Sequence, residues 1–282
     1  MDKKRSSYGV LDYLENERSG FEKNLLLSRE SFDPEGIHQF RLSLKRIRSL
    51  FHMLEFVLED KFDADVEFVP FRSPFKAGGV LRDIHVHLDM IGECEQELGT
   101  QFDKTRDFLF FQQETAERRL LKNTARPLKK DFVHLSKLLK KRLNVIFESE
   151  FNQRSFHWVV SELSYLKDIH GFIIDPAVFH RFRRHQKETF YMIDFINNFT
   201  TGNIEIKGSL KELKEIARKI GTWHDHHNLI IRIRYIRLLS HDQRLKIYSE
   251  CQAIEEYFAR NQKELFNQLV MELDNEGLFQ LK

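Results

Sequence analysis

The clearest pattern of apolar positions along the chain lies between residues 35 and 60. Apolar residues recur there at alternating steps of three and four, which places them along one face of an α-helix. Asp33, Pro34 and Glu35 come just before and supply a capping side chain, a proline for the first turn and an acid at the positive end of the helix dipole. The pattern therefore predicts an amphipathic helix that begins near residue 34. Its apolar positions are Ile37, Phe40, Leu44, Ile47, Phe51, Leu54 and Leu58.

The same periodicity recurs along most of the chain and predicts further helices. Their expected ranges are about 8–30, 70–98, 103–125, 128–150, 153–169, 176–199, 208–240 and 243–274. Pro127 should break or kink the helical pattern around it, because proline lacks the amide hydrogen that a helix interior uses. Gly171, Asp175–Pro176 and Thr201–Gly202–Asn203 are typical of joints between helices. Because no segment alternates apolar and polar residues with a period of two, we expect an all-α fold made of helical bundles.

Composition narrows the class of protein further. With 12 Gly and 5 Pro in 282 residues, the chain holds too few turn-forming residues for the many reversals of a β-sandwich or barrel. Hydrophobic residues make up 41% of the chain and include 26 Phe, which is enough apolar surface for a well-buried core. No apolar run approaches about 18 residues, and the N-terminal segment lacks the apolar stretch of a signal peptide. Cys94 and Cys251 form no CxxC pair and are expected to be buried small residues, so we expect a cytoplasmic protein that does not bind membranes.

The net charge of +2 does not by itself indicate a polyanionic partner, but the charges are unevenly distributed. Residues 118–142 contain ten Lys or Arg and a single acid, Asp131. Residues 36–54 contain four Lys or Arg and two His, with no acid. Acidic residues concentrate in segments such as 55–67 and 250–276. Segregated charge creates a local field even when the total is near zero, so each basic segment is a candidate surface for an anion.

Two short sequences occur twice in the chain at the same offset. IHQFRLSLK at residues 37–45 corresponds to FHRFRRHQK at 179–187, and GVLRDIH at 79–85 corresponds to GTWHDHH at 221–227. Two motifs that recur at one offset indicate duplication of a unit of about 140 residues, which is the size of a four-helix bundle. The identical pairs, each 142 positions apart, are His38 and His180, Phe40 and Phe182, Arg41 and Arg183, Lys45 and Lys187, Gly79 and Gly221, Asp83 and Asp225, and His85 and His227.

The first repeated motif has a geometric meaning. Steps of three and then four residues place His38, Arg41 and Lys45 on one face of a helix. In the first copy Arg48 and His52 extend this face, which runs beside the apolar stripe, where two helices of a bundle form a groove. A face that served only to keep the helix soluble would include acids for intrahelical ion pairs. The absence of acids and the repetition of the pattern therefore predict a binding surface for a linear polyanion.

The second repeated motif contains carboxylates. Asp83 follows Arg82 in the first copy, and Asp225 follows His224 in the second. A carboxylate beside a polyanion site repels the ligand unless it is engaged elsewhere. We therefore expect each aspartate to accept hydrogen bonds from a site arginine or histidine and to fix its orientation.

A second basic face lies within residues 128–146, where Lys130, His134, Lys137 and Lys141 follow one another at steps of four, three and four. Lysines are common on solvent-exposed helix faces. The sequence therefore leaves open whether this face joins the same site.

At the repeated motifs the chain resembles a known family, the conserved histidine α-helical domain, or CHAD. The family's patterns, roughly His-x-x-Arg-x-x-x-Arg/Lys-Arg-x-Arg and Leu-Gly-x-x-Arg-Asp, are similar to the segments that begin at His38 and just before Gly79. The resemblance spans about residues 8–275. It implies two four-helix bundles related by pseudo-twofold symmetry, with a basic cleft or pore between them. We expect these bundles at residues 1–150 and 151–282.

The resemblance also implies binding of inorganic polyphosphate, with no known catalytic role of the domain itself. We expect no cofactor and no metal site. The second copy departs from the first at Glu188, Phe190 and Asp194, where the first has Arg46, Arg48 and His52, so we expect the first half to dominate binding. The candidate polyphosphate-binding residues are His38, Arg41, Lys45, Arg46, Arg48, Arg82, Arg126, Lys130, Lys137, His180, Arg183, Arg184, Lys187 and His224.

A metal-dependent phosphohydrolase is a rival interpretation. His224 and Asp225, with His180 or His185 and Asp242, include residue types that ligate metals. The first copy, however, has an arginine at the position of His224, and arginine does not ligate a metal. The repeat therefore favours binding over metal catalysis.

Nucleic-acid binding is another alternative, because phosphate contacts also dominate the affinity of basic grooves for RNA and DNA. Against it, aromatic residues of the motif region, such as Phe40 and Phe182, fall at core spacing and not as a stacking platform. A scaffold for an acidic protein partner is a third possibility. The sequence determines neither the oligomeric state nor a preferred polyphosphate chain length.

Overall fold

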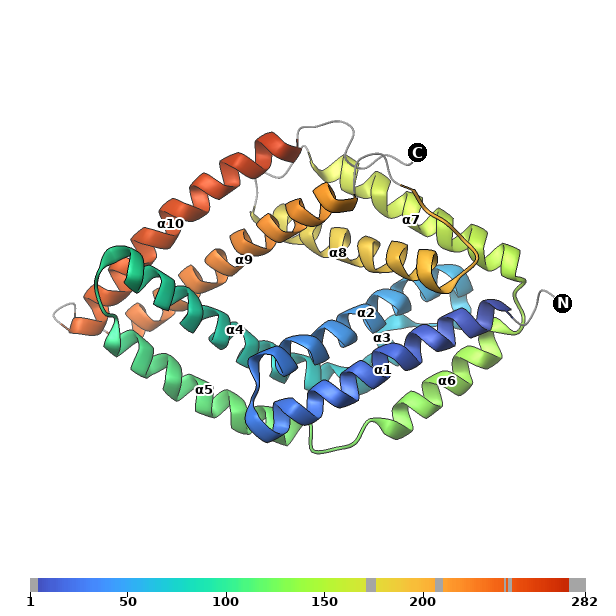
Figure 1. Cartoon of the computed structure of the whole chain (residues 1–282), viewed down its shortest axis with the longest axis horizontal. Coiled ribbons are helices and arrows are strands. Elements are labelled where there is room, and N and C mark those ends of the chain that lie inside the picture. The colour runs from blue at the N-terminus through green and yellow to red at the C-terminus, as the bar shows by residue number, and fades with distance from the viewer. Residues whose placement is uncertain (1–4, 171–175, 206–209, 241, 243–244, 274–282) are drawn as a thin grey trace.

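The computed structural model describes residues 5–170, 176–205, 210–240, 242 and 245–273 of the 282-residue chain, and within them every regular element is a helix (Figure 1). The all-α prediction is therefore confirmed. The elements are α1 (Arg5–Ser31), α2 (Pro34–Leu58), a 3₁₀ turn (Glu59–Lys61), α3 (Ala64–Glu67), α4 (Val69–Leu98), α5 (Asp103–Asn123), α6 (Lys129–Leu143), α7 (Glu148–His170), α8 (Pro176–Phe199), α9 (Leu210–Leu239) and α10 (Lys246–Leu273).

The predicted start of α2 has the expected chemistry. The Asp33 carboxylate accepts a hydrogen bond from the backbone N–H of Gly36 at 2.6 Å, and Pro34 occupies the first turn. The helix expected over residues 128–150 instead ends at Leu143, and the next begins at Glu148 rather than near 153. The buried side chain of Ile146 holds the connection between them against the core.

The duplication is visible in the order of the helices. The helices α1, α2, α4 and α5 of the first repeat correspond in order to α7, α8, α9 and α10 of the second. In particular, α2 begins at Pro34 and α8 at Pro176, and α4 and α9 are both 30 residues long. Helix α6 links the two repeats and packs against α1.

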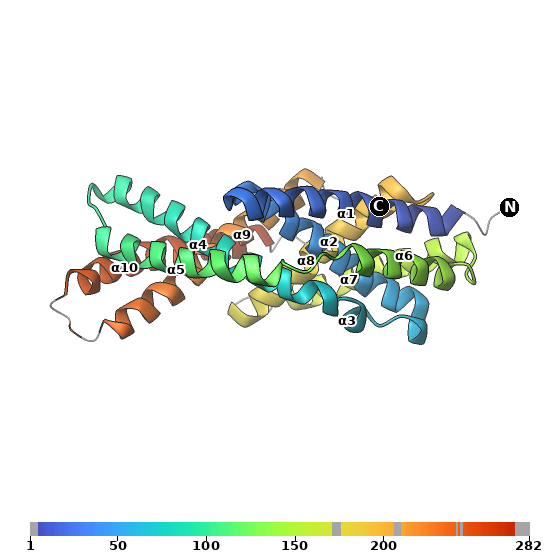
Figure 2. The same cartoon turned by 90° about the horizontal axis from the view of Figure 1, so that it is seen from below.

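The two four-helix bundles do not coincide with the two repeats. The hairpin α1–α2 packs against α7–α8, and α4–α5 packs against α9–α10. Figures 1 and 2 show these two groups end to end along the long axis. Each bundle thus takes one hairpin from each repeat, and the contacts of α2 with α4 and of α8 with α9 join the bundles.

Contacts between the repeats explain this exchange of hairpins. In the first bundle the Tyr13 ring of α1 meets Phe195 and Phe199 of α8, with ring centroids 5.0 and 5.1 Å apart. In the second bundle the buried Glu250 of α10 accepts hydrogen bonds from the backbone N–H and the hydroxyl of Thr105, in the first turn of α5. In each bundle, therefore, a hairpin of one repeat buries apolar and polar side chains of a hairpin from the other repeat.

No helix among the described residues combines the length and the apolar character that crossing a membrane requires. Nor does that described part of the chain contain a group of three or more His, Cys, Asp or Glu side chains arranged to hold a metal ion.

Candidate polyanion-binding site

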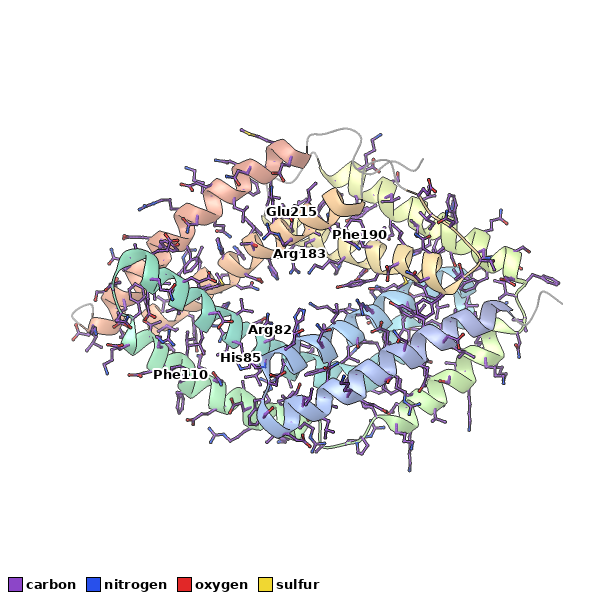
Figure 3. The ribbon with its side chains drawn as sticks, viewed as in Figure 1. Arg82, His85, Phe110, Arg183, Phe190 and Glu215 are labelled. Atoms are coloured by element: carbon purple, nitrogen blue, oxygen red, sulfur yellow. The ribbon has the colours of Figure 1, made fainter. Side chains whose placement is uncertain are left out.

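The four helices that carry the repeated motifs, α2, α4, α8 and α9, face one another at the centre of the molecule, and Figure 3 shows Arg82 and Arg183 on opposite sides of this centre. The electrostatic neighbours of Lys45 include Lys187 and Arg183, and those of His38 include Arg82 and Lys187. Motif residues of both repeats therefore form one group, called here the central cluster. Its members are His38, Arg41, Lys45, Arg82, Asp83, His180, Arg183, Lys187, His224 and Asp225.

Glycine in the second motif makes room for the arginine of the first. A Cβ atom at Gly79 would lie 2.5 Å from Nη1 of Arg41. The same guanidinium lies 4.7 Å from the centroid of the Phe75 ring and donates a hydrogen bond to the Phe75 carbonyl oxygen. In the second repeat a Cβ at Gly221 would lie 3.9 Å from Nη2 of Arg183. In both repeats, then, the motif arginine passes over the motif glycine.

The two motif aspartates lie in the field of these arginines. The strongest opposing charge on Asp83 is Arg41, and on Asp225 it is Arg183. Burial nevertheless raises the pKa of both carboxyl groups above the ordinary value, and the cations only partly offset it. Among the described residues, neither aspartate is hydrogen-bonded to a motif arginine or histidine, so the expected orienting hydrogen bonds are not present. Each aspartate acts through its charge, one turn beyond the glycine.

The two motif lysines are held in an environment that disfavours their charge. Burial, followed by the nearby Arg41, Lys187 and Arg183, lowers the pKa of Lys45 to about 7. Burial and the neighbouring Arg183 lower the pKa of Lys187 to about 8. Two equivalent lysines therefore sit among cations whose mutual repulsion is only partly offset by Asp83 and Asp225.

The second repeat adds a group of histidines whose pKa values are lowered by burial, and the sequence motifs indicated only part of this group. The His180 ring lies 4.6 Å from that of His224 and 5.2 Å from that of His227, and the indole of Trp223 stacks on His227. Burial and then the Arg183 guanidinium lower the pKa of His224 to about 3. The sequence repeat pairs His227 with His85, but only the structure places His227 beside His180.

Two predicted binding residues of α2 contact protein groups outside the cluster. Arg46 pairs at 3.3 Å with the buried carboxylate of Glu17 on α1, and its guanidinium lies 5.8 Å from the Tyr191 ring centroid. Arg48 lies 5.8 Å from the ring centroid of Phe68. Glu188, which stands at the position of Arg46 in the second repeat, is 3.1 Å from His52 of α2. Arg46 therefore offsets the charge of a buried acid.

The predicted residues between α5 and α7 do not join the cluster. Arg126 is exposed and pairs with Asp131 at 2.8 Å, and Lys130 and Lys137 lie exposed on α6. Helix α6 packs its apolar side, which includes Phe132, against α1. The helix lies on the outside of the molecule (Figure 1), and its lysines are exposed. The structure thus places this basic face away from the central cluster. Arg184, on α8, is likewise exposed.

Taken together, the fold and the cluster define an all-α protein with two bundles made by exchange of hairpins between duplicated units, and with a shared cationic centre. The sequence model of the CHAD domain matches residues 12–234, so the chain belongs to the CHAD domain family. The chain is also similar to a solved structure described as the CHAD domain from the plant Ricinus communis, with a TM-score of 0.66 and 18% identity over 98% of this chain and 94% of that one. This likeness supports the fold. A search of curated proteins finds no match.

Proposed function

We propose that this protein binds inorganic polyphosphate, without hydrolysing it, in the central cluster. One observation carries the proposal: Lys45 and Lys187, from equivalent positions of the two repeats, are buried among further cations, and their pKa values fall to about 7 and about 8. A protein that only needed stability would not keep cations in such surroundings, because desolvation and mutual repulsion both cost free energy. A polyanion bound in the cluster offsets the cost of desolvation and the cost of mutual repulsion.

The residue types suit a chain of phosphates. Arg41 and Arg183 offer forked donors to phosphate oxygens, and the lysines add compact charges. The Nε of Arg183 and the Nδ1 of His224 are buried and have no hydrogen-bond partner among the residues that the structure describes. Because inorganic polyphosphate offers only oxygen acceptors, a cluster rich in donors matches it along its length.

Binding without hydrolysis is supported by the repeat. Arg82 stands at the position of His224, and an arginine does not ligate a metal ion. Phosphate release from polyphosphate or nucleotides should stay at background with or without Mg²⁺ or Mn²⁺. Turnover that survives purification and is lost in His224→Ala would overturn this part of the proposal. A cytoplasmic role in polyphosphate-granule targeting or storage is the cellular use that we predict.

Titration calorimetry with long-chain polyphosphate, at several salt concentrations, tests the ligand. Affinity should fall steeply with salt, since bound phosphates release condensed counterions. Polyphosphate should also outcompete single-stranded RNA of equal charge, because the motif rings Phe40 and Phe182 are fully buried and so provide no row of rings along the cluster on which successive bases could stack. RNA binding as tight as polyphosphate binding would assign the cluster to nucleic acid instead.

A further inference from the structure

A groove lies beside the central cluster, between α4, α5 and α9. Its volume is about 660 Å³, within the range of small-molecule sites. Val80 and Ile84 of α4 contribute apolar side chains to its lining. Its walls carry three large side chains that are more than half exposed: Phe111 (65%), Ile231 (52%) and Tyr235 (54%). A hollow with an exposed aromatic ring on each of two helices is suited to hold a flat apolar group.

Polar side chains from α4, α5 and α9 lie among the apolar walls of the groove. Arg232 of α9 donates a hydrogen bond to the side-chain oxygen of Gln112 on α5, at 2.9 Å, across the groove. The Asn228 amide lies 3.3 Å from Nε2 of His224 and so links the groove to the cluster. His87 lines the groove and is only 2% exposed, and within the described part of the chain its Nδ1 has no hydrogen-bond partner. An apolar site with a small number of placed polar groups is typical of ligand recognition.

Asp83 belongs both to the groove and to the cluster. Its side chain lines the groove, and the cations that act on its carboxyl group are Arg41, Arg232, Lys45 and Arg82. The groove therefore ends where the cationic surface begins. A ligand with a flat ring at one end and a chain of negative charges at the other would fill both.

We propose that the groove holds the base of a nucleoside polyphosphate whose phosphate chain lies in the central cluster, an inference that rests on the proposed function. The rings of Phe111 and Tyr235 offer faces for the base, and the amides of Gln112 and Asn228 offer donors and acceptors for its edge. The ribose hydroxyls donate to Asp83, which explains a carboxylate at the border of a phosphate site. A lipid chain would use the apolar walls but not these polar groups.

Calorimetric titration with ATP and with inorganic tripolyphosphate, at one ionic strength and without divalent metal, tests the inference. The two probes share a triphosphate chain and differ in the base and ribose. We expect ATP to bind at least about tenfold more tightly, because stacking a base on exposed rings is worth about an order of magnitude in affinity. The double variant Phe111→Ala, Tyr235→Ala should remove this advantage and leave tripolyphosphate binding unchanged. Both side chains are largely exposed, so the variant should fold.

Phe110→Ala is the matched control. Phe110, labelled on α5 in Figure 3, precedes Phe111 and is 45% exposed, but it is not among the residues that line the groove. It should change neither titration. An ATP advantage that persists in the double variant would place the base elsewhere and overturn the inference.

Long-chain polyphosphate, titrated into the same proteins, separates this inference from the proposed function. If polyphosphate binds but ATP is no better than tripolyphosphate, the groove is not a nucleoside site and the proposed function stands. If ATP binds with the predicted dependence on Phe111 and Tyr235 while polyphosphate does not bind, the groove stands and the proposed function fails. If no probe binds, both are wrong.

Discussion

The Arg41 guanidinium occupies the space that a side chain at Gly79 would need, since a Cβ there would lie 2.5 Å from Nη1. The equivalent pair in the second repeat, Arg183 and Gly221, is less tight at 3.9 Å. The arginine of the first sequence motif therefore lies directly against the glycine of the second. The glycine of one motif allows the arginine of the other to lie across α4, beside the carboxyl group of Asp83.

Gly79→Ala should therefore weaken polyphosphate binding without unfolding the protein. The added methyl group meets the far end of a long side chain, so Arg41 must move, while alanine in a helix interior gains up to about 1 kcal/mol over glycine. We expect a several-fold loss of affinity with an unchanged or higher melting temperature. Gly221→Ala, where 3.9 Å is an ordinary contact, is the control and should leave affinity nearly unchanged. Equal effects of the two substitutions would contradict the role of this close approach.

The affinity for polyphosphate should fall as pH rises from 6 to 9. In the free protein Lys45 and Lys187 lose their protons with pKa values of about 7 and about 8, whereas a bound polyanion favours the charged forms. Binding above pH 7 must therefore take up protons, which makes it weaker as pH rises. Calorimetry in buffers of different ionisation enthalpy measures this uptake. Lys45→Arg keeps the charge at every pH and should flatten the profile, while Lys263→Arg, on the exposed side of α10, should not.

The same lysines also affect how the stability of the ligand-free protein changes with pH. The pKa of Lys45 is about 7 in the folded protein against an ordinary value of 10.5, so between these values the unfolded chain binds more protons. Stability of the free protein should then rise with pH across this window. Urea unfolding at pH 7 and pH 9 measures it. The slope should be smaller in Lys45→Met, and a wild-type stability that falls with pH would show that other groups dominate.

The sequence predicted much of this fold and part of the site. Helix periodicity and the cap at Asp33 are local, so they located α2 and most other helices. The offset between the repeats identified equivalent residues such as His38 and His180. It could not show which hairpin packs on which, because a duplicated apolar face fits its own repeat and the other equally well. Likewise, the lysines of α6 formed a regular stripe, but only the packing of Phe132 shows that this stripe faces away from the cluster.

Arg46 should matter for stability more than for binding. It pairs with Glu17, which is 4% exposed and whose pKa is raised by burial. Arg46→Met leaves that carboxylate buried without its cation, at a cost of about 1–3 kcal/mol in the free energy of unfolding. The loss should be greatest at pH 7 and should shrink toward pH 4, where Glu17 is protonated. Glu17→Gln combined with Arg46→Met should recover part of the stability. A large loss of polyphosphate affinity with unchanged stability would instead return Arg46 to the binding surface.

Reversing the charge of Arg41 should weaken polyphosphate binding far more than reversals outside the central cluster. Arg41 is surrounded by Lys45, Arg82 and Asp83, so its replacement by glutamate removes a charge-assisted contact and adds repulsion where water screens little. The expected loss is at least about tenfold, which corresponds to about 1.4 kcal/mol. The dependence of affinity on salt should also become shallower, because fewer counterions are displaced.

Two controls make the Arg41 experiment specific. Lys137→Glu lies on the exposed face of α6 and Lys263→Glu on that of α10, and both change the net charge by the same amount as Arg41→Glu. A ligand held in the central cluster responds to them only through a screened, distant field, so the change should stay within about twofold at 0.15 M salt. If all three reversals lowered affinity equally, the attraction would follow net charge alone. Lys45 and Lys187 would then be buried for some reason other than a polyanion.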